Sequence, residues 1–344
     1  MADLSFAYAN ARVKAAKSKL FDRDRMRDLA EVGSLTQFIE LLEESEYKPS
    51  FVSESTRHSG LELVKAALDD DLARKLEKVE AIVPDGAKPA LHAILRQWEV
   101  NNIKKVLAAK ALGKPVSTGD LLPVGGGSKS LCQKLVGAQT LKEAVSTVQA
   151  AYRGHPGVCK AASEFSRTQD VRPLLSALDE AYYRSLAKLA RGQRDPFTRK
   201  FLLYRIDFAN AMMILRMRRT GVPHERIRHH LVTGASRAVI AEMLGAKTQR
   251  AALQAFARLR HVQFSETAYA ALDGNGPLSQ IEVEFEKAFL SDARSTASVS
   301  VLSLGAVVAY LHLKQEEVHS LRKIAYATQF DVRDDVKKTV LAAY

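Results

Sequence analysis

The chain has 344 residues, of which 47% are hydrophobic and 26% charged, a composition that excludes disordered, collagen-like and low-complexity proteins. Its 18 glycines and 10 prolines are few for this length, which favours long helices over an all-β fold with its many turns. An excess of 51 lysines and arginines over 39 acidic residues leaves a net charge of +12, so we expect an anionic partner: nucleic acid, lipid head groups or an acidic protein.

Helices are expected along most of the chain. Apolar residues three and four positions apart predict helices over residues 35–44 and 61–79. Ser34, Thr140 and Thr248 stand where the N-cap of a following helix is expected. The first two are followed, three residues later, by the glutamine or glutamate of a capping box. No convincing pair of strands is found. Loops are expected over residues 48–59, 83–89, 116–128, 193–196 and 273–277.

The chain repeats itself at a shift of 108 residues. The first copy has Glu99, Asn102, Lys110, Gly113 and Pro115, and the second has Asp207, Asn210, Arg218, Gly221 and Pro223. A fainter third copy carries Glu317 and Ser320. The front of the chain supplies the missing half, because residues 29–42 match residues 135–148 at a shift of 106. We therefore expect three helical repeat units, residues 1–115, 116–223 and 224–344.

Each repeated motif is expected to end a helix. An acid in the first turn suits the positive end of a helix, and Lys110 or Arg218 in the last turn suits the negative end. Gly113 and Gly221 stand where a left-handed C-cap residue is wanted, and the proline two residues later prevents the helix from continuing.

The acid–asparagine pairs of these helices allow two interpretations. They could hold a cation or a ligand at a shared axis. They could instead form hydrogen bonds between helices or to a neighbouring loop. Because the pair recurs in every unit, we favour the structural interpretation.

No enzyme motif is found. The glycine-rich residues 124–130 resemble a phosphate-binding loop, but that loop needs a lysine directly after its last glycine, and Ser128 intervenes here. Cys132 and Cys159 lack metal-binding spacing. The arginines among the three histidines of residues 224–230 oppose a metal ion, so we interpret this segment as a solvated basic loop or helix start. We expect no catalytic residue, no cofactor and no metal site.

Positive charge is concentrated in residues 184–228, where twelve bases face three acids and supply nine of the twelve net charges. Such a stretch forms either solvated helix faces or a surface for an anionic partner. Aromatic residues interleave with the bases only weakly, and no known nucleic-acid-binding motif is present. A basic helical nucleic-acid-binding protein stays open as an alternative, with binding that falls steeply as salt rises.

Five stretches carry a resemblance over essentially the whole chain: YANARVKA at 8–15, LTQFIELLEESEY at 35–47, EVNNIKKVL at 99–107, DFANAMMILR at 207–216 and YLHLKQEEVHSLRKI at 310–324. In their order and spacing, the chain resembles the C subunit of the archaeal and bacterial A/V-type rotary ATPases, which corresponds to the d subunit of eukaryotic V-ATPases. It departs from that family at Ser320, where asparagine is usual.

This resemblance implies an all-α fold of three similar units around a pseudo-threefold axis, shaped like a funnel. It implies a non-catalytic central-stalk subunit that links the central shaft to the membrane rotor ring and transmits torque for ATP-coupled proton or sodium transport. Such a subunit lies on the cytoplasmic face of the membrane without spanning it, and binds other subunits rather than nucleic acid or a small-molecule substrate. The expected partner-binding residues are Arg12, Asn102, Asn210, Arg216 and Arg218. Structural roles are expected for Glu99, Asp207, Glu317, Ser320, Gly113 and Gly221.

Overall fold

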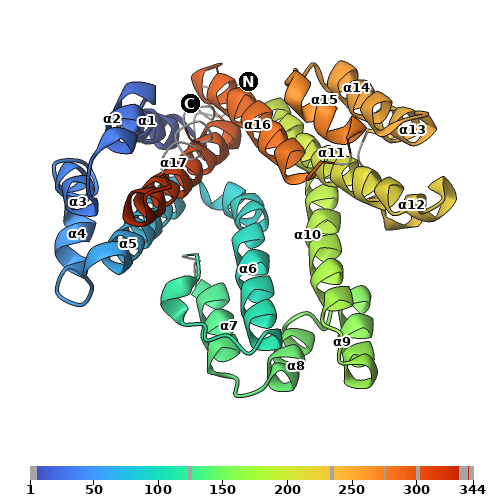
Figure 1. Ribbon diagram of the computed structural model, residues 1–344, viewed down its shortest axis with the longest axis horizontal. Coiled ribbons are helices and arrows are strands. Elements are labelled where there is room, and N and C mark those ends of the chain that lie inside the picture. Colours follow the sequence, from blue (N-terminus) through green and yellow to red (C-terminus); the bar gives the residue numbers. More distant parts are fainter. Residues whose placement is uncertain are drawn as a thin grey trace. The chain divides into compact units, whose positions relative to one another are not determined.

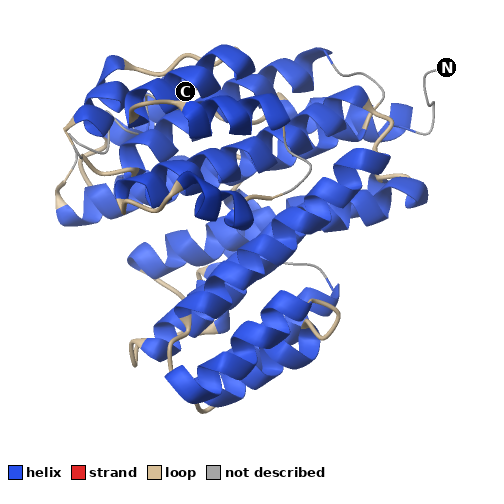
Figure 2. Ribbon diagram, turned by 90° about the vertical axis from the view of Figure 1, so that its right-hand side faces the viewer, coloured by secondary structure: helices blue, strands red, loops and turns tan. Residues whose placement is uncertain are grey.

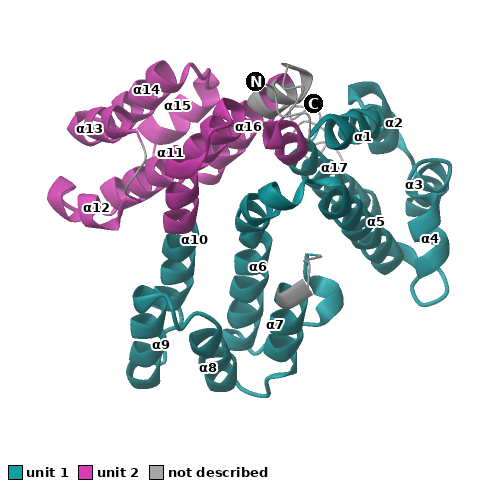
Figure 3. Ribbon diagram, turned by 180° about the vertical axis from the view of Figure 1, so that it is seen from behind, with its two compact units in different colours: residues 1–182, 310–344 teal, residues 183–309 magenta. Residues whose placement is uncertain are grey.

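The computed structural model describes residues 6–122, 126–232, 236–274, 276–299, 303–332 and 340. Within these residues it contains seventeen α-helices and short 3₁₀ turns, and no strand (Figures 1 and 2). The expected all-α fold class is therefore confirmed. The helices group into two compact units, residues 1–182 with 310–344 and residues 183–309, which we call unit 1 and unit 2 (Figure 3).

Unit 1 holds the helices from both ends of the chain. These are α1 (Ala7–Lys17), α2 (Arg23–Glu31), α3 (Leu35–Glu43), α4 (Lys48–Glu54), α5 (Gly60–Ile82), α6 (Lys88–Ala111), α7 (Gly126–Gly137), α8 (Leu141–Ala151), α9 (Pro156–Thr168), the first half of α10 (Arg172–Gly192) and most of α17 (Leu304–Phe330). The 3₁₀ turns η2 (Asp85–Ala87) and η3 (Thr118–Asp120) flank α6. Inside this unit Trp98 Nε1 of α6 donates to Gln315 Oε1 of α17 at 3.0 Å, so the last helix packs among the first ones.

Unit 2 is built around α11. It holds the second half of α10, then α11 (Pro196–Arg219), α12 (His224–His230), α13 (Arg237–Gly245), α14 (Gln249–Arg260), α15 (Glu266–Asp273) and α16 (Ser279–Val299). An aromatic cluster surrounds Phe285 of α16, whose ring centroid lies 4.7 Å from those of Phe208 and Phe256 and 4.9 Å from that of Phe264. Such ring pairs add to the apolar burial that holds α11, α14 and α16 together.

Short polar side chains begin the helices where the sequence predicts. The hydroxyl groups of Ser34, Thr140 and Thr248 each accept a hydrogen bond from the backbone N–H three residues later, which confirms the three N-caps. The two expected capping boxes are shifted by one residue. The side chain three residues after each cap binds the N–H of the residue before the cap, rather than that of the cap itself.

Glycine ends both long repeated helices. Gly113 has φ +64° and Gly221 has φ +72°, a left-handed conformation that other residues adopt at a cost. The N–H of the next residue bonds to the carbonyl five positions earlier, at 2.9 Å for Lys114 and 3.0 Å for Val222. This is the Schellman arrangement, and it confirms the predicted ends of α6 and α11.

Other boundaries differ from the prediction. The helices expected over 35–44 and 61–79 are present as α3 and α5. The loop expected over 48–59 is wrong in its first half, because residues 48–54 form α4. Pro49 lies in the first turn of α4, where its missing N–H costs nothing, and Phe51 is fully buried. The proline is thus part of a helix start rather than a breaker.

The boundaries of the two compact units fall inside α10, after Tyr182, and inside α17, after Ala309. The division into three repeat units at 115 and 223, and their arrangement around a pseudo-threefold axis, stay predictions. Among the helices of the described residues, none combines the length and the apolar character that a bilayer crossing requires.

Candidate functional site: polar clusters on the repeated helices

The two acid–asparagine pairs lie near the middle of equally long helices. Glu99 and Asn102 belong to the 24 residues of α6, and Asp207 and Asn210 to the 24 residues of α11. The prediction that the acid stands in the first turn is therefore wrong, and the helix dipole, which acts only within that turn, cannot be its reason. All four side chains are buried, so their partners lie inside the protein.

Each asparagine holds one loop residue through two hydrogen bonds. Asn102 Oδ1 accepts from the N–H of Leu122 at 2.8 Å, and its Nδ2 donates to the carbonyl of the same residue at 2.9 Å. Asn210 binds Val232 in the same way, at 2.8 and 3.1 Å. A side-chain amide donates and accepts at once, so this residue type fits the position. The geometry supports the structural interpretation of the pairs.

The acid of unit 1 accepts two hydroxyl hydrogen bonds. The hydroxyl of Tyr152 donates to Glu99 Oε1 at 2.8 Å, and that of Ser128 donates to Oε2. Burial and the neighbouring carboxylate of Glu99 raise the pKa of Tyr152 above its ordinary value. The phenol therefore stays protonated and remains a donor, and it ties α6 to the end of α8.

The acid of unit 2 has partners at the corresponding positions. Asp207 Oδ1 accepts from the backbone N–H of Ser236 at 2.9 Å, and its other oxygen forms an ion pair with Arg260. Ser236 and Arg260 lie 108 residues after Ser128 and Tyr152. Burial lowers the pKa of Arg260. The same socket thus holds its acid with a hydroxyl in one unit and with a guanidinium in the other.

The bases at the ends of α6 and α11 also obey the shift of 108. Lys110 Nζ donates to the carbonyls of Val136 and Ala138, at 3.2 and 2.5 Å. Arg218 donates to the carbonyls of Leu244 and Ala246, at 3.2 and 2.7 Å. These two residues lie 108 positions after Val136 and Ala138. Each base satisfies carbonyls that the end of the following short helix leaves open.

The third copy of the motif lies on α17, within unit 1. Glu317 accepts from the hydroxyl of Tyr47 at 2.7 Å and from the N–H of Phe21 at 2.5 Å. Tyr47 aligns within one residue of Tyr152 at the shift of 106, so the tyrosine–acid contact recurs. Ser320 is buried, but among the described residues it makes no pair of loop hydrogen bonds like those of the asparagines.

A buried lysine that the sequence did not single out lies beside Glu317. Lys314 Nζ is 2.9 Å from Glu317 Oε1 and 2.8 Å from Asp71 Oδ2, and lies 4.0 Å from the centroid of the Tyr47 ring. Its side chain is only 3% exposed. Burial alone would lower the pKa of Lys314, but the two carboxylates raise it above its ordinary value. The lysine is therefore charged and joins α17 to α5.

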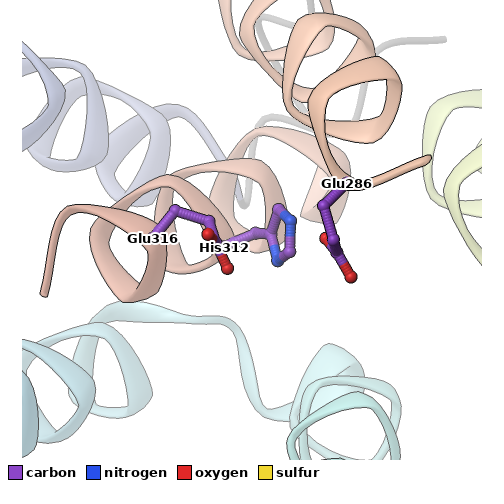
Figure 4. Close-up of side chains that lie close together, drawn as sticks. All are labelled: Glu286, His312 and Glu316. Carbon is purple, nitrogen blue, oxygen red and sulfur yellow. The ribbon is translucent and has the colours of Figure 1, made fainter. Parts of the chain in front are cut away.

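Figure 4 labels Glu286, His312 and Glu316. His312 and Glu316 lie one helical turn apart on α17 and belong to unit 1, whereas Glu286 belongs to α16 of unit 2. Glu316 Oε1 pairs with His319 Nδ1 at 3.4 Å. Although burial opposes it, this contact lowers the pKa of Glu316 to about 2. Within either unit taken alone, the described residues contain no group of three potential metal ligands, and we assign no metal site.

The sequence model of one family, the ATP synthase (C/AC39) subunit, matches residues 9–338 of the chain. The chain belongs to this family.

Relatives of this C/AC39 chain are similar over nearly its whole length. It is 26% identical over 332 residues to the C subunit of the A-type ATP synthase of Haloquadratum walsbyi, covering 95% of both chains. It is 26% identical to the protein of the same name from Pyrococcus horikoshii, covering 93% of this chain and 85% of the relative. For the protein of that name from Haloferax volcanii, the identity is 27% and the coverage 92% of each. The C/AC39 chain is thus a subunit of an ATP synthase complex.

The expected partner-binding residues of this C/AC39 chain have different surroundings. Arg12 on α1 is exposed, and Arg216 is exposed and forms an ion pair with Glu282. Asn102, Asn210 and Arg218 instead bind loop backbone inside their own units. Whether any of the five contacts another subunit stays a prediction.

The basic residues of the stretch 184–228 do not all lie on one solvent-exposed face. Arg205 is buried and lies 4.9 Å from the Phe289 ring centroid and 3.5 Å from Glu286. Arg219 donates to the carbonyl of Gly276 at 2.7 Å. Together with Arg218, these residues direct their charge to partners inside unit 2. This weakens the alternative of a continuous nucleic-acid-binding surface, because such a surface needs its bases free for phosphates.

Replacing Asn102 by alanine is expected to destabilise the protein by about 2 kcal/mol, because the backbone N–H and carbonyl of Leu122 lose their partners. Urea unfolding followed by circular dichroism measures the difference. The matched control is Ser320→Ala on α17, at the third copy of the same position, which should cost less than about 1 kcal/mol. Equal losses in the two variants would contradict the assigned role of the asparagine.

Proposed function

We propose that this protein is a non-catalytic central-stalk subunit that joins the central shaft of an A/V-type ATP synthase to its membrane rotor ring. The match of residues 9–338 to the ATP synthase (C/AC39) subunit family carries the proposal. The subunit would lie on the cytoplasmic face of the membrane and pass torque between the shaft and a ring that moves protons or sodium ions. It would do so through non-covalent contacts alone.

The polar clusters support a mechanical role. A part that transmits torque must resist twisting, and loops between helices are where a helical protein yields first. In this chain Asn102, Asn210, Lys110 and Arg218 fix such loops to the repeated helices α6 and α11. Close-packed helices with pinned connections deform little under load. In this proposal the repeated motif makes the subunit stiff, and exposed residues bind the partner subunits.

Arg12 and Arg216 are the exposed members of the expected contact set, and we propose that they bind acidic groups of the shaft or the ring. Charge complementarity across such interfaces fixes partner choice and register. We also propose that the three repeat units, with ends at residues 115 and 223, build the socket around a pseudo-threefold axis.

The test of this function is the double charge reversal Arg12→Glu with Arg216→Glu. It should weaken co-purification with the shaft and ring subunits about tenfold and lower ion transport per ATP hydrolysed. Stability should change little, because the Arg216–Glu282 pair is exposed.

The matched control reverses two other exposed bases, Arg153→Glu with Arg167→Glu on the surface of unit 1. Arg167 also pairs with an acid one turn away, Glu164, at 3.4 Å. The control should retain both partners and full coupling. If the shaft and ring subunits co-purify with the Arg12 and Arg216 variant as they do with the control, the contact assignment is wrong. If they do not co-purify with the unaltered protein, the function is wrong.

A further inference from the structure

The short helix α12 displays its polar side chains to solvent. Six of its seven residues are exposed, and Ile227 alone is buried. The exposed residues are His224, Glu225, Arg226, Arg228, His229 and His230. Ile227 is the one side chain of this short helix that is buried in the packing of unit 2, and the bases of the helix are not.

The corresponding segment of unit 1 shows that the fold does not need these bases. It also follows a Schellman ending, and it is also held by an asparagine, since Asn102 binds Leu122 as Asn210 binds Val232. Its 3₁₀ turn η3 carries Asp120, which forms an ion pair with Lys65 of α5. The same connection is thus built once without an exposed basic cluster and once with one.

The cations of α12 itself have no acidic partner of their own among the ion pairs of the described residues. Arg226 and Arg228 form none of the ion pairs found there, and Glu225 is the one acid on the helix. From the neighbouring α11, Arg218 Nη1 approaches His224 Nε2 at 3.2 Å, which adds a cation rather than an acid. The two arginines therefore outnumber the single acid of the helix.

We propose that α12 binds the head groups of anionic phospholipids. Arg226 and Arg228 are exposed, and none of the exposed large hydrophobic side chains of the described residues lies on this helix. Protein interfaces are usually centred on buried apolar or aromatic anchors, which this surface lacks. A basic surface without an apolar anchor suits the head-group layer of an anionic bilayer, whose charge is spread evenly over the membrane plane. Guanidinium groups also bind phosphate oxygens through two parallel hydrogen bonds.

This inference goes beyond the proposed role of the subunit, because a socket for shaft and ring needs no lipid contact. Lipid binding would give one side of unit 2 a second attachment to the membrane surface. Each basic residue near an anionic bilayer raises the binding constant about fivefold, and the effect falls within a Debye length as salt is added.

The experiment is flotation of the full-length protein with vesicles of phosphatidylcholine, with and without phosphatidylglycerol, at low and high salt. We expect binding to the phosphatidylglycerol vesicles at low salt only. The variant Arg226→Gln with Arg228→Gln should lower the binding constant about 25-fold. The control variant Lys142→Gln with Arg153→Gln removes the same charge from exposed positions on unit 1 and should bind almost as well as the unaltered protein.

Three outcomes would overturn the proposal. Equal binding to both kinds of vesicle would exclude head-group charge as the cause. Equal losses in the two variants would show that net charge, and not α12, is responsible. Binding of the α12 variant to phosphatidylglycerol vesicles as strong as that of the unaltered protein would show that α12 does not bind the head groups. None of these results depends on co-purification with the shaft and ring, so the two proposals can fail separately.

Discussion

Replacing Lys314 with methionine is expected to destabilise the protein by about 3–5 kcal/mol. The variant keeps most of the side-chain volume but removes the cation that lies between the buried carboxylates of Asp71 and Glu317. Asp71 then keeps only the more distant Lys75, at 3.7 Å. Removal of one partner from a buried ion pair costs more than the pair itself contributes, because the remaining charge has lost both water and its counter-ion. The cation–π contact with Tyr47 is lost as well. Urea unfolding at neutral pH measures the loss.

The control for this prediction is the same substitution on the same helix at Lys323, which is exposed and should change stability by less than about 0.5 kcal/mol. Adding Asp71→Asn and Glu317→Gln to the Lys314 variant should recover part of the loss, since these changes remove the uncompensated charges. A Lys314 variant as stable as the Lys323 variant would contradict this ion-pair network.

Asp207→Ala is expected to cost about 3–5 kcal/mol, clearly more than Glu99→Ala, which should cost about 1–3 kcal/mol. Both acids occupy the same position of the repeat, but their partners differ. Loss of Asp207 leaves the guanidinium of Arg260, which is only partly exposed, without this counter-ion. Loss of Glu99 leaves two neutral hydroxyl groups, those of Tyr152 and Ser128, which are less costly to desolvate. Its one cationic partner, Arg96 at 4.0 Å, is exposed and stays hydrated when the acid is removed.

Thermal and urea unfolding of the two alanine variants, side by side, measure this difference. The double variant Asp207→Ala with Arg260→Leu should regain part of the stability, because it removes the stranded cation together with its partner. The corresponding double variant in unit 1, Glu99→Ala with Tyr152→Leu, should show no such recovery, since the phenol carries no charge. Equal losses of stability in Asp207→Ala and Glu99→Ala would contradict the proposed difference between the partners of the two acids.

Local patterns of the sequence predicted local structure well. Hydroxyl residues before apolar runs marked three N-caps, and glycine followed by proline marked the ends of α6 and α11. These features depend on a few neighbouring residues, so the sequence contains all the physics that decides them. The shift of 108 residues also relates contacts between the copies, because a contact found in one copy indicates a contact between the corresponding residues of another.

Contacts between distant residues without a repeated counterpart could not be predicted. Lys314 and Asp71 are separated by most of the chain, and no pattern of the sequence pairs them, so only the fold brings them together. The first-turn position of Glu99 failed for a different reason. Apolar residues before Glu99, such as Leu91 and Trp98, do indicate a longer helix, but the prediction began the helix at the acid of the repeated motif.

The contacts of Glu317 have a consequence for the order of folding. The asparagine and lysine contacts of α6 close loops of 20 to 28 residues, which form early because short loops lose little chain entropy. Glu317, in contrast, joins residues 270 and 296 positions away, Tyr47 and Phe21. During synthesis from the N-terminus, the first helices must therefore wait for the last one before this socket can close. The earliest part of the chain to leave the ribosome is among the last to be completed, and until then it is the part that most needs protection from aggregation and proteolysis.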